Sequence, residues 1–226
     1  MNCLWCDEEI HVTIDWTTIA MPPKAQPICD TCAEGVQELT GSRCRKCSRL
    51  STKRVCEDCL WWEEYLHGDD SIEFNYSVFP YSNQMQEIIA KWKYRGDYEL
   101  GYIFRESFLT HYKTVFAKVK DAVVVPIPLS DERIHERCFN QAKMLAEFLP
   151  LETKEVLTRV HGEKQSKKSR HERITSNNPF ILQQNLNNPV IIVDDIYTTG
   201  TTLRHAAKLL KLHGCPSVYT YTLVRG

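Results

Sequence analysis

The fold of this chain is decided by the stretch Pro189-Val-Ile-Ile-Val-Asp194-Asp195-Ile-Tyr-Thr198-Thr199-Gly200-Thr201-Thr202. Residues 190–193 form a continuous apolar run, which is typical of a central strand buried on both faces. Beyond the threonines, Leu203, Ala206, Ala207 and Leu210 share one face of an amphipathic helix. A buried strand that passes directly into such a helix predicts an α/β fold, with a parallel sheet flanked by helices.

The polar residues between strand and helix predict a binding site for a sugar phosphate. Asp194 and Asp195 follow the apolar run, at the end of the strand where open α/β sheets bind ligands. Gly200 permits positive φ and a close approach of the backbone to a phosphate. The helix N-terminus supplies N–H groups and a positive dipole end. Hydroxyl donors are added by Thr198, Thr199, Thr201 and Thr202. We expect the loop to hold a 5-phosphate while the acids hold ribose hydroxyls or Mg²⁺.

A plainer interpretation of the same stretch is an ordinary helix start. Thr201 or Thr202 would cap the helix, and the two acids would be solvated. A cap, however, requires neither paired acids nor five such loop residues.

Length and composition place few limits on function. The chain has 226 residues and a formal net charge of -1, so it has room for one medium domain and a small appendage. No apolar run approaches the roughly 18 residues of a membrane span, and the N-terminus does not resemble an export signal. We therefore expect a cytoplasmic protein without membrane insertion.

Cysteines are concentrated near the N-terminus. Of ten cysteines, eight form four Cys-x-x-Cys turns: Cys3/Cys6, Cys29/Cys32, Cys44/Cys47 and Cys56/Cys59. Two such turns complete a tetrahedral shell of four sulfurs, so the pattern predicts two structural zinc ions. We favour sequential pairing of the turns. A crossed pairing of the first turn with the third stays open, as does an iron–sulfur cluster. We expect residues 1–67 to form the zinc-binding module and residues 68–226 the α/β domain.

Other residues of the N-terminal region allow two interpretations. The basic residues around the last two turns either contact nucleic acid or form a solvated face; they are Arg43, Arg45, Lys46, Arg49, Lys53 and Arg54. The tryptophans of this region either stack on bases or supply core; they are Trp5, Trp16, Trp61 and Trp62.

Patterning along the remaining chain predicts the other elements. We expect a linker over residues 63–70, a strand within residues 72–81 and a helix from Asn83 through Trp92. A basic triplet, Lys91, Lys93 and Arg95, ends that helix and either complements its dipole or reaches an anionic ligand. Beyond it we expect a helix over residues 100–112, a buried strand over 122–125, one helix over 133–149 that carries Arg137, and a final alternating strand over 218–224.

Three motifs resemble known families. The run Asp-Asp-x-x-Thr-Thr-Gly-Thr-Thr resembles the phosphoribosyl-diphosphate (PRPP) signature of type I phosphoribosyltransferases. The phrase Arg137-Cys138-Phe139-Asn140-Gln141-Ala142 resembles the Arg-Gly-Phe-Asn-Gln-Ala motif of the ComF family, with cysteine in place of glycine. In the basic stretch 159–173, a glutamine and an Arg-x-x-Arg also match that family; these are Gln165, Arg170 and Arg173. With the cysteine turns, the resemblance to ComF extends over nearly the whole chain.

The resemblance implies a fold and a function. The fold is that of a type I phosphoribosyltransferase with N-terminal zinc ribbons, and PRPP with Mg²⁺ binds at residues 194–202. On this resemblance, we expect the protein to assist the uptake of single-stranded DNA in natural transformation, beside a competence helicase and other transformation proteins. Contacts to nucleic acid or diphosphate are expected from Arg137, Gln165, Lys167, Lys168, Arg170 and Arg173. Two further possibilities stay open: an active phosphoribosyltransferase with an unknown acceptor, and a non-catalytic module that binds PRPP and single-stranded DNA.

Overall fold

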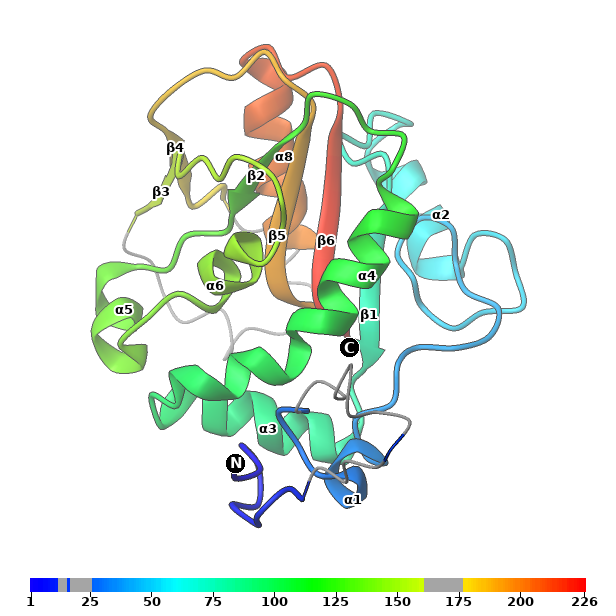
Figure 1. The fold of residues 1–226 in the computed structure, drawn as a ribbon. Coiled ribbons are helices and arrows are strands. Elements are labelled where there is room, and N and C mark those ends of the chain that lie inside the picture. The colour runs from blue at the N-terminus through cyan, green and yellow to red at the C-terminus, as the bar shows by residue number, and fades with distance from the viewer. Residues whose placement is uncertain (12–15, 17–25, 161–176) are drawn as a thin grey trace.

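The computed structural model describes residues 1–11, 16, 26–160 and 177–226. Its centre is a four-stranded parallel sheet of order β1-β6-β5-β2 (Figure 1). The strands are β1 (Asn75–Pro80), β2 (Val123–Pro126), β5 (Val190–Tyr197) and β6 (Val218–Arg225). A separate antiparallel pair is formed by β3 (Leu157–Arg159) and β4 (Phe180–Leu182). The predicted parallel sheet is confirmed.

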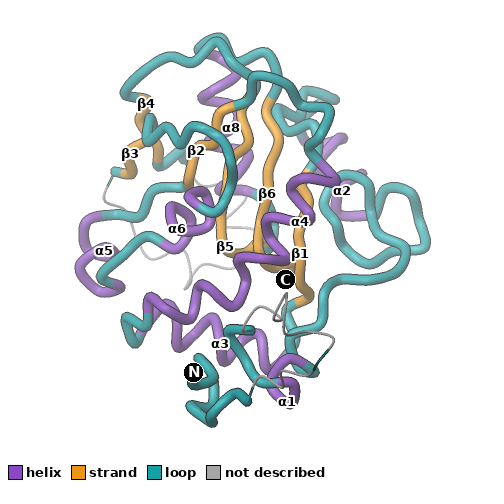
Figure 2. Tube along the Cα trace, viewed as in Figure 1, coloured by secondary structure: helices purple, strands orange, loops and turns teal. Residues whose placement is uncertain are grey.

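Helices cover both faces of this sheet (Figures 1 and 2). The helices are α1 (Asp30–Ala33), α2 (Glu57–Tyr65), α3 (Asn83–Tyr94), the 3₁₀ helix η1 (Tyr98–Phe104), α4 (Arg105–Val115), α5 (Asp131–Arg137), α6 (Gln141–Glu147) and α8 (Thr201–Leu212). Along β5, Ile191 and Val193 pack with α3, η1 and α4, while Val190 and Ile192 pack with α8. The continuous apolar run therefore serves two cores, as predicted for a strand buried on both faces.

Four elements differ from the sequence prediction. The final strand, β6, is central rather than alternating, because β1 and β5 flank it and nearly all of it is buried. The helix expected over residues 133–149 is two helices. Cys138 adopts the left-handed conformation with φ 68°, and Asn140 then caps α6 by accepting from the Ala142 amide. The predicted linker begins too early, since α2 runs to Tyr65. The start of the helix predicted over 100–112 is the 3₁₀ helix η1.

The cysteine turns lie on opposite sides of the sheet. The first group, Cys3, Cys6, Cys29 and Cys32, packs with the core that contains α3 and α4. The second group, Cys44, Cys47, Cys56 and Cys59, packs with the core that contains α8. Both groups therefore contribute to the packing of the sheet.

None of the helices in the described ranges has the length and apolarity that a membrane span requires.

Candidate functional site

A cavity of about 310 Å³ lies where β5 ends and α8 begins. Asp194 lines it from β5, and residues 198–202, here called the threonine loop, line it from the strand–helix junction. Lys93 and Tyr94 come from the end of α3, and Arg133, Glu136 and Arg137 come from α5. The cavity therefore joins residues that are far apart in the sequence at the carboxyl edge of the sheet, where open α/β folds bind ligands.

The two acids belong to β5 itself, which continues to Tyr197. Asp194 faces the cavity, and its Oδ1 accepts a hydrogen bond from the Asp195 amide at 2.8 Å. Burial, followed by the negative charge of Asp195, raises the pKa of the Asp194 carboxyl to about 7. The negative charge of Asp195 is balanced by Lys93, whose Nζ lies 2.7 Å from Asp195 Oδ2. Arg137 Nη1 lies 4.0 Å from the same oxygen. The adjacent acids are thus different in charge environment.

Gly200 shapes the threonine loop. It has φ 76° and is the N-cap of α8, with no side-chain cap bond. A Cβ at this position would lie 2.3 Å from the Tyr197 hydroxyl and 2.5 Å from Arg204 Nη1, so only glycine fits. The alternative in which Thr201 or Thr202 caps the helix is wrong. The Thr199 and Thr201 hydroxyls instead lie 2.9 Å apart, at a helix N-terminus that favours anions.

Lys93 and Arg137 supply buried positive charge. Both are less than a tenth exposed, and Arg137 was predicted from the sequence to contact an anion. Among the described residues, Arg137 Nε and the Nε2 atom of its partner Gln141 are buried donors without a hydrogen-bond partner. Buried donors are normally satisfied, so these atoms fit a site that receives an anionic ligand.

Lys93 was not assigned to the site from the sequence. Within its basic triplet, Lys91 pairs with Asp97 at 3.5 Å and Arg95 is the C-cap of α3, whereas Lys93 points to Asp195. The basic triplet was a sequence signal, since contact with an anionic ligand was one of its two interpretations. Burial singles out Lys93 within the triplet, and it follows the buried Trp92 in α3.

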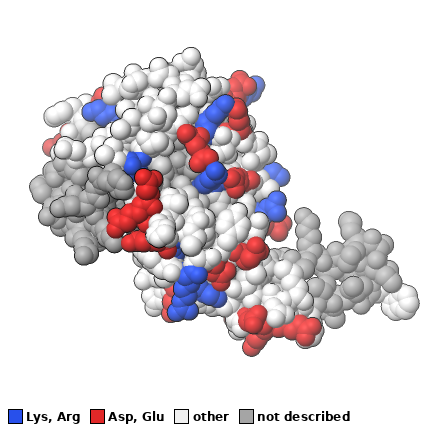
Figure 3. All heavy atoms as spheres, turned by 90° about the vertical axis from the view of Figure 1, so that its left-hand side faces the viewer, with Lys and Arg blue, Asp and Glu red and all other residues white. Residues whose placement is uncertain are grey.

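The structure does not describe all residues predicted for this site. Five candidates for nucleic-acid or diphosphate contact lie outside the described residues: Gln165, Lys167, Lys168, Arg170 and Arg173. On the face shown in Figure 3, lysines and arginines of the described residues are interspersed with acids rather than gathered in one patch.

The basic residues around the second cysteine group are largely engaged within the protein. Arg49 pairs with Asp58, Lys53 with Glu57, and Arg43 lies over the Tyr76 ring. The tryptophans are divided: Trp62 is 4% exposed, whereas Trp61 is 40% and Trp16 is 91% exposed. Only part of the predicted core role of these tryptophans is therefore observed.

Each cysteine group has the shape of a tetrahedral metal site. All four sulfurs of a group lie within 4.8 Å of one another, and the turns are grouped in chain order. Cys6 and Cys29 sulfurs are 3.7 Å apart, and Cys47 and Cys56 sulfurs are 3.6 Å apart. A tetrahedron with Zn–S bonds of about 2.3 Å has edges of roughly 3.8 Å, so these residues fit zinc. Backbone amides also donate to the Cys3 and Cys44 sulfurs.

Comparisons with known proteins agree with this architecture. A family model described as "Phosphoribosyl transferase domain" matches residues 134–226, which include the acids and the threonine loop. The competence protein ComFC of Bacillus subtilis (strain 168) is 37% identical, over 99% of this chain and 94% of the relative. The competence protein ComFC of Streptococcus pneumoniae is 29% identical over 100% of both chains.

A solved structure is also similar to part of the chain. It is a hypoxanthine phosphoribosyltransferase from Staphylococcus aureus, 18% identical over 62% of this chain and 64% of that chain, with a TM-score of 0.28, too low to assign a fold. The resemblance to ComF proteins found in the sequence is confirmed by the full-length relatives. This chain belongs to the ComFC family of competence proteins and carries a phosphoribosyltransferase-like domain.

Proposed function

We propose that this protein binds PRPP with Mg²⁺ at Asp194, Asp195 and the threonine loop, and assists the handling of single-stranded DNA in natural transformation. The observation that carries the proposal is the cavity at the carboxyl edge of the sheet, where Asp194, the N-terminus of α8, Lys93 and Arg137 converge. A ribose 5-phosphate needs both kinds of group: acceptors for its hydroxyls and donors for its phosphate.

The residues divide the ligand between them. Thr198, Thr199, Gly200, Thr201 and Thr202 would hold the 5-phosphate through backbone amides and hydroxyls. Asp194, open to the cavity, would accept hydrogen bonds from the ribose hydroxyls. Lys93 and Arg137 would face the diphosphate, where a buried cation interacts strongly with an anion. The buried donors of Arg137 and Gln141, which have no hydrogen-bond partner in the described part of the chain, support this arrangement.

Magnesium would be shared between protein and ligand. Among the described residues, the groups of three or more potential metal ligands are the two cysteine groups. Their sulfur ligands do not suit Mg²⁺, which prefers oxygen ligands. One or two carboxylates together with substrate oxygens are a usual environment for Mg²⁺. Asp194 and Asp195 would hold the ion only when the ligand is present, and the ion would neutralise charge on the diphosphate.

We further propose that each cysteine group binds one structural zinc ion, that residues 1–67 form the zinc-binding module, and that residues 68–226 form the phosphoribosyltransferase-like domain. Four thiolates leave no open coordination position, so these ions would support folding rather than catalysis. Single-stranded DNA, a competence helicase and other transformation proteins are the proposed partners, in the cytoplasm. The relatives named for competence support this part of the proposal.

PRPP binding is tested by thermal unfolding. Saturating PRPP and Mg²⁺ should stabilise the native protein by about 2.7 kcal/mol at a ligand concentration of 100 Kd, or roughly 5–10 °C for a chain of this size. Lys93→Met should reduce the affinity at least about tenfold, because it removes a charge-assisted hydrogen bond. Each shift is measured from the variant's own ligand-free Tm.

Lys91→Met is the matched control for that test. Lys91 lies two positions away on the same helix but pairs with Asp97 outside the cavity, so its ligand shift should equal that of the wild type. The double variant Asp194→Asn/Asp195→Asn should show no shift. An unchanged shift in both Lys93→Met and the double variant would contradict the proposed site.

Catalysis is a second candidate, favoured by the match to the phosphoribosyltransferase family model. Displacement of diphosphate at C1 of the ribose would rest on positioning and electrostatic stabilisation. A screen of acceptors for diphosphate release tests it. Release that depends on Asp194 would establish an enzyme. If PRPP stabilises the protein and no acceptor yields diphosphate, the function is that of a binding module.

A further inference from the structure

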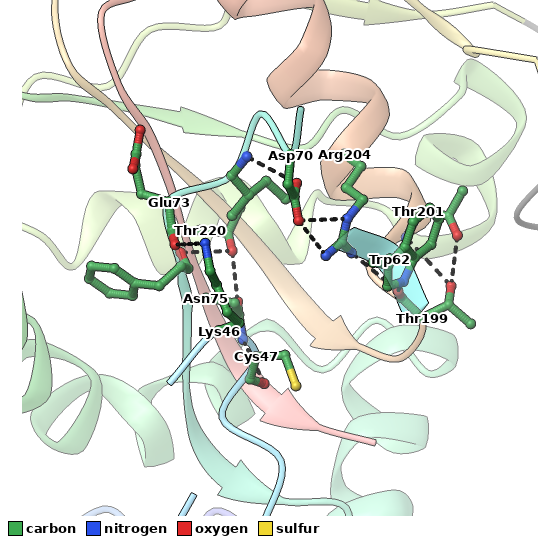
Figure 4. A network of polar contacts seen from close by, with 12 residues as sticks. Lys46, Cys47, Trp62, Asp70, Glu73, Asn75, Thr199, Thr201, Arg204 and Thr220 are labelled. Carbon is green, nitrogen blue, oxygen red and sulfur yellow. Dashed lines mark hydrogen bonds and ion pairs between the residues drawn. The ribbon is translucent and has the colours of Figure 1, made fainter. Parts of the chain in front are cut away.

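The backbone of the threonine loop is hydrogen-bonded to residues that lie beside the second cysteine group. Trp62 lies on α2, one helical turn after Cys59, and is only 4% exposed. Its Nε1 donates to the Thr199 carbonyl at 3.0 Å (Figure 4). A helix whose first turn contains a predicted metal ligand thus holds the backbone of the predicted phosphate site directly.

Arg225, at the end of β6, forms a second connection. Its Nη1 donates to the carbonyls of Tyr197 at 3.1 Å and Thr198 at 3.3 Å. Its Nη2 lies 3.7 Å from the Cys47 sulfur, and its guanidinium lies 4.9 Å from the centre of the Tyr197 ring. One buried cation therefore contacts a sulfur of the cysteine group and two carbonyls at the start of the loop.

Further contacts make this connection stiff. Arg204 lies over the Trp62 ring at 4.3 Å and pairs with Asp70 at 2.8 Å. The cysteine group is itself fixed to the sheet by Asn75, whose side chain donates to the Cys47 carbonyl at 3.4 Å and accepts from the Thr220 hydroxyl at 3.0 Å (Figure 4). Buried networks of hydrogen bonds and ion pairs rigidify the elements that they join.

The geometry of the peptide bond gives these contacts a functional consequence. In a trans peptide, the carbonyl of one residue and the N–H of the next point in opposite directions. Because Trp62 and Arg225 hold the carbonyls of Thr199 and Thr198 on the cysteine side, the N–H groups of Gly200 and Thr199 are directed away from that side. The loop lines the Asp194 cavity together with α3 and α5, whereas Cys47, Cys59 and Trp62 line a separate pocket with Thr198 and Thr199.

The first cysteine group serves as an internal comparison. It packs with the opposite core of the sheet. In the described part of the chain, no hydrogen bond or ion pair joins it to Thr198, Thr199 or Gly200. Any effect transmitted by these contacts should therefore be specific to the second group.

We propose that Trp62 and Arg225 are positioning residues that couple metal binding in the second cysteine group to ligand binding in the threonine loop. The proposal rests on PRPP as the ligand and on zinc as the metal of the proposed function. Coupling between two sites is reciprocal: the metal strengthens PRPP binding by aligning the loop amides, and PRPP strengthens retention of that metal by the same factor.

The test combines calorimetry with metal release. Trp62→Phe keeps the ring and removes the N–H donor, Arg225→Lys keeps the charge and removes the fork, and Trp61→Phe is the matched control on the exposed side of α2. Loss of one hydrogen bond corresponds to roughly a 5- to 10-fold loss of PRPP affinity. We expect that loss for Trp62→Phe and Arg225→Lys, and wild-type affinity for Trp61→Phe. The Tm of each zinc-loaded variant shows that it is folded.

Metal retention supplies a readout that is independent of activity. In the wild type, PRPP and Mg²⁺ should slow the loss of one of the two zinc ions to a chromogenic chelator. Thiol alkylation with peptide mapping should show that the protected ion belongs to Cys44, Cys47, Cys56 and Cys59. In Trp62→Phe and Arg225→Lys this protection should weaken in step with the affinity.

Two negative outcomes are distinguishable. If wild-type PRPP binding is absent, the proposed function fails, and the coupling falls with it. If the wild type binds PRPP while Trp62→Phe and Arg225→Lys bind equally well, or while PRPP protects both cysteine groups alike, the proposed function stands and the coupling is overturned. Should one of the two variants fail to fold, the other decides the result.

Discussion

At the residue scale, Asp194 and Asp195 show how neighbouring carboxylates acquire different roles. Lys93 neutralises Asp195 inside the protein, at 2.7 Å. Asp194 faces the cavity, and burial together with the charge of Asp195 raises its pKa to about 7. Asp195 therefore joins β5 to α3 through Lys93. Asp194 lines the cavity, where it can bind a ligand that carries positive charge or hydroxyl donors.

The stability of the ligand-free protein should fall with pH because of Asp194. The folded protein keeps the Asp194 proton up to about pH 7, whereas the unfolded chain releases it near the ordinary value of 3.8. Between these values the native state binds more protons, so the free energy of unfolding decreases as pH rises. Asp194→Asn removes this destabilisation, which amounts to roughly 1.4 kcal/mol for each unit by which the pKa is shifted. The variant should therefore have a Tm several degrees above that of the wild type at pH 8 and nearly the wild-type Tm at pH 4.

Asp195→Asn is the control for that prediction and should have the opposite sign. It leaves the buried Lys93 without its partner, and breaking a buried pair costs about 3–5 kcal/mol. Thermal unfolding of both variants from pH 4 to pH 8, without added Mg²⁺, gives the comparison. Equal destabilisation by the two substitutions at pH 8 would contradict the different environments assigned to the two acids.

Apart from Arg137, which the ComF motif indicated, the site residues that could be predicted from the sequence are those close to one another in the chain. Asp194, Asp195 and Gly200 occur in one short stretch whose order carries the chemistry. Lys93 could not be assigned, because its role depends on the end of α3 lying beside β5, which local patterning does not reveal. Arg204 and Trp62 were missed for the same reason: their contacts with Thr199 join distant elements.

At the scale of elements, the junction between α5 and α6 is the main departure from periodic patterning. Apolar spacing alone predicts one helix, but the backbone turns at Cys138, with φ 68°. The related ComF motif has glycine at this position, and the structure gives the reason, since glycine adopts a left-handed conformation without steric cost. The break allows Arg137 to line the cavity from α5 while Asn140 starts a new helix.

Cys138→Gly should therefore stabilise the protein. A side chain in the left-handed region costs roughly 1–2 kcal/mol, and part of that gain is offset by the greater freedom of glycine in the unfolded chain. We expect a net gain of about 1 kcal/mol, or roughly 2–4 °C in Tm. Cys138→Ala, which removes the thiol but keeps the Cβ, should leave Tm unchanged. Stabilisation by alanine alone would show that the thiol, not the backbone, was the cause.

At the scale of the whole molecule, the two cysteine groups contribute to both cores of one sheet. Cys3 belongs to the same buried cluster as Ile191 and Val193, and the second group belongs to the cluster that contains Val190 and Ile192. The sequence predicted a metal-binding module at the N-terminus but could not predict that its two halves would pack against opposite faces. That arrangement depends on long-range contacts such as those of Asn75.

Removal of the metals should weaken the entire protein. Binding of structural zinc contributes about 10–16 kcal/mol in zinc-finger peptides, so we expect a strong chelator to lower the Tm by roughly 10 °C or more. Metal analysis of the purified protein should give two zinc ions per chain. Added Zn²⁺ should restore the Tm and added Mg²⁺ should not. A metal-free preparation with an unchanged Tm would contradict both sites.

The central position of β6 has a consequence for biosynthesis. Asn75 in β1 bonds to Thr220 in β6, 145 residues further along the chain, and among the described strands β6 is the only one paired with β1. During synthesis on the ribosome, the backbone groups of β1 that pair with β6 remain unpaired until residues 218–225 have emerged from the exit tunnel. Until then, the nascent chain carries β1 as an unpaired strand, and the cysteine turns that precede it in translation are available to bind metal first.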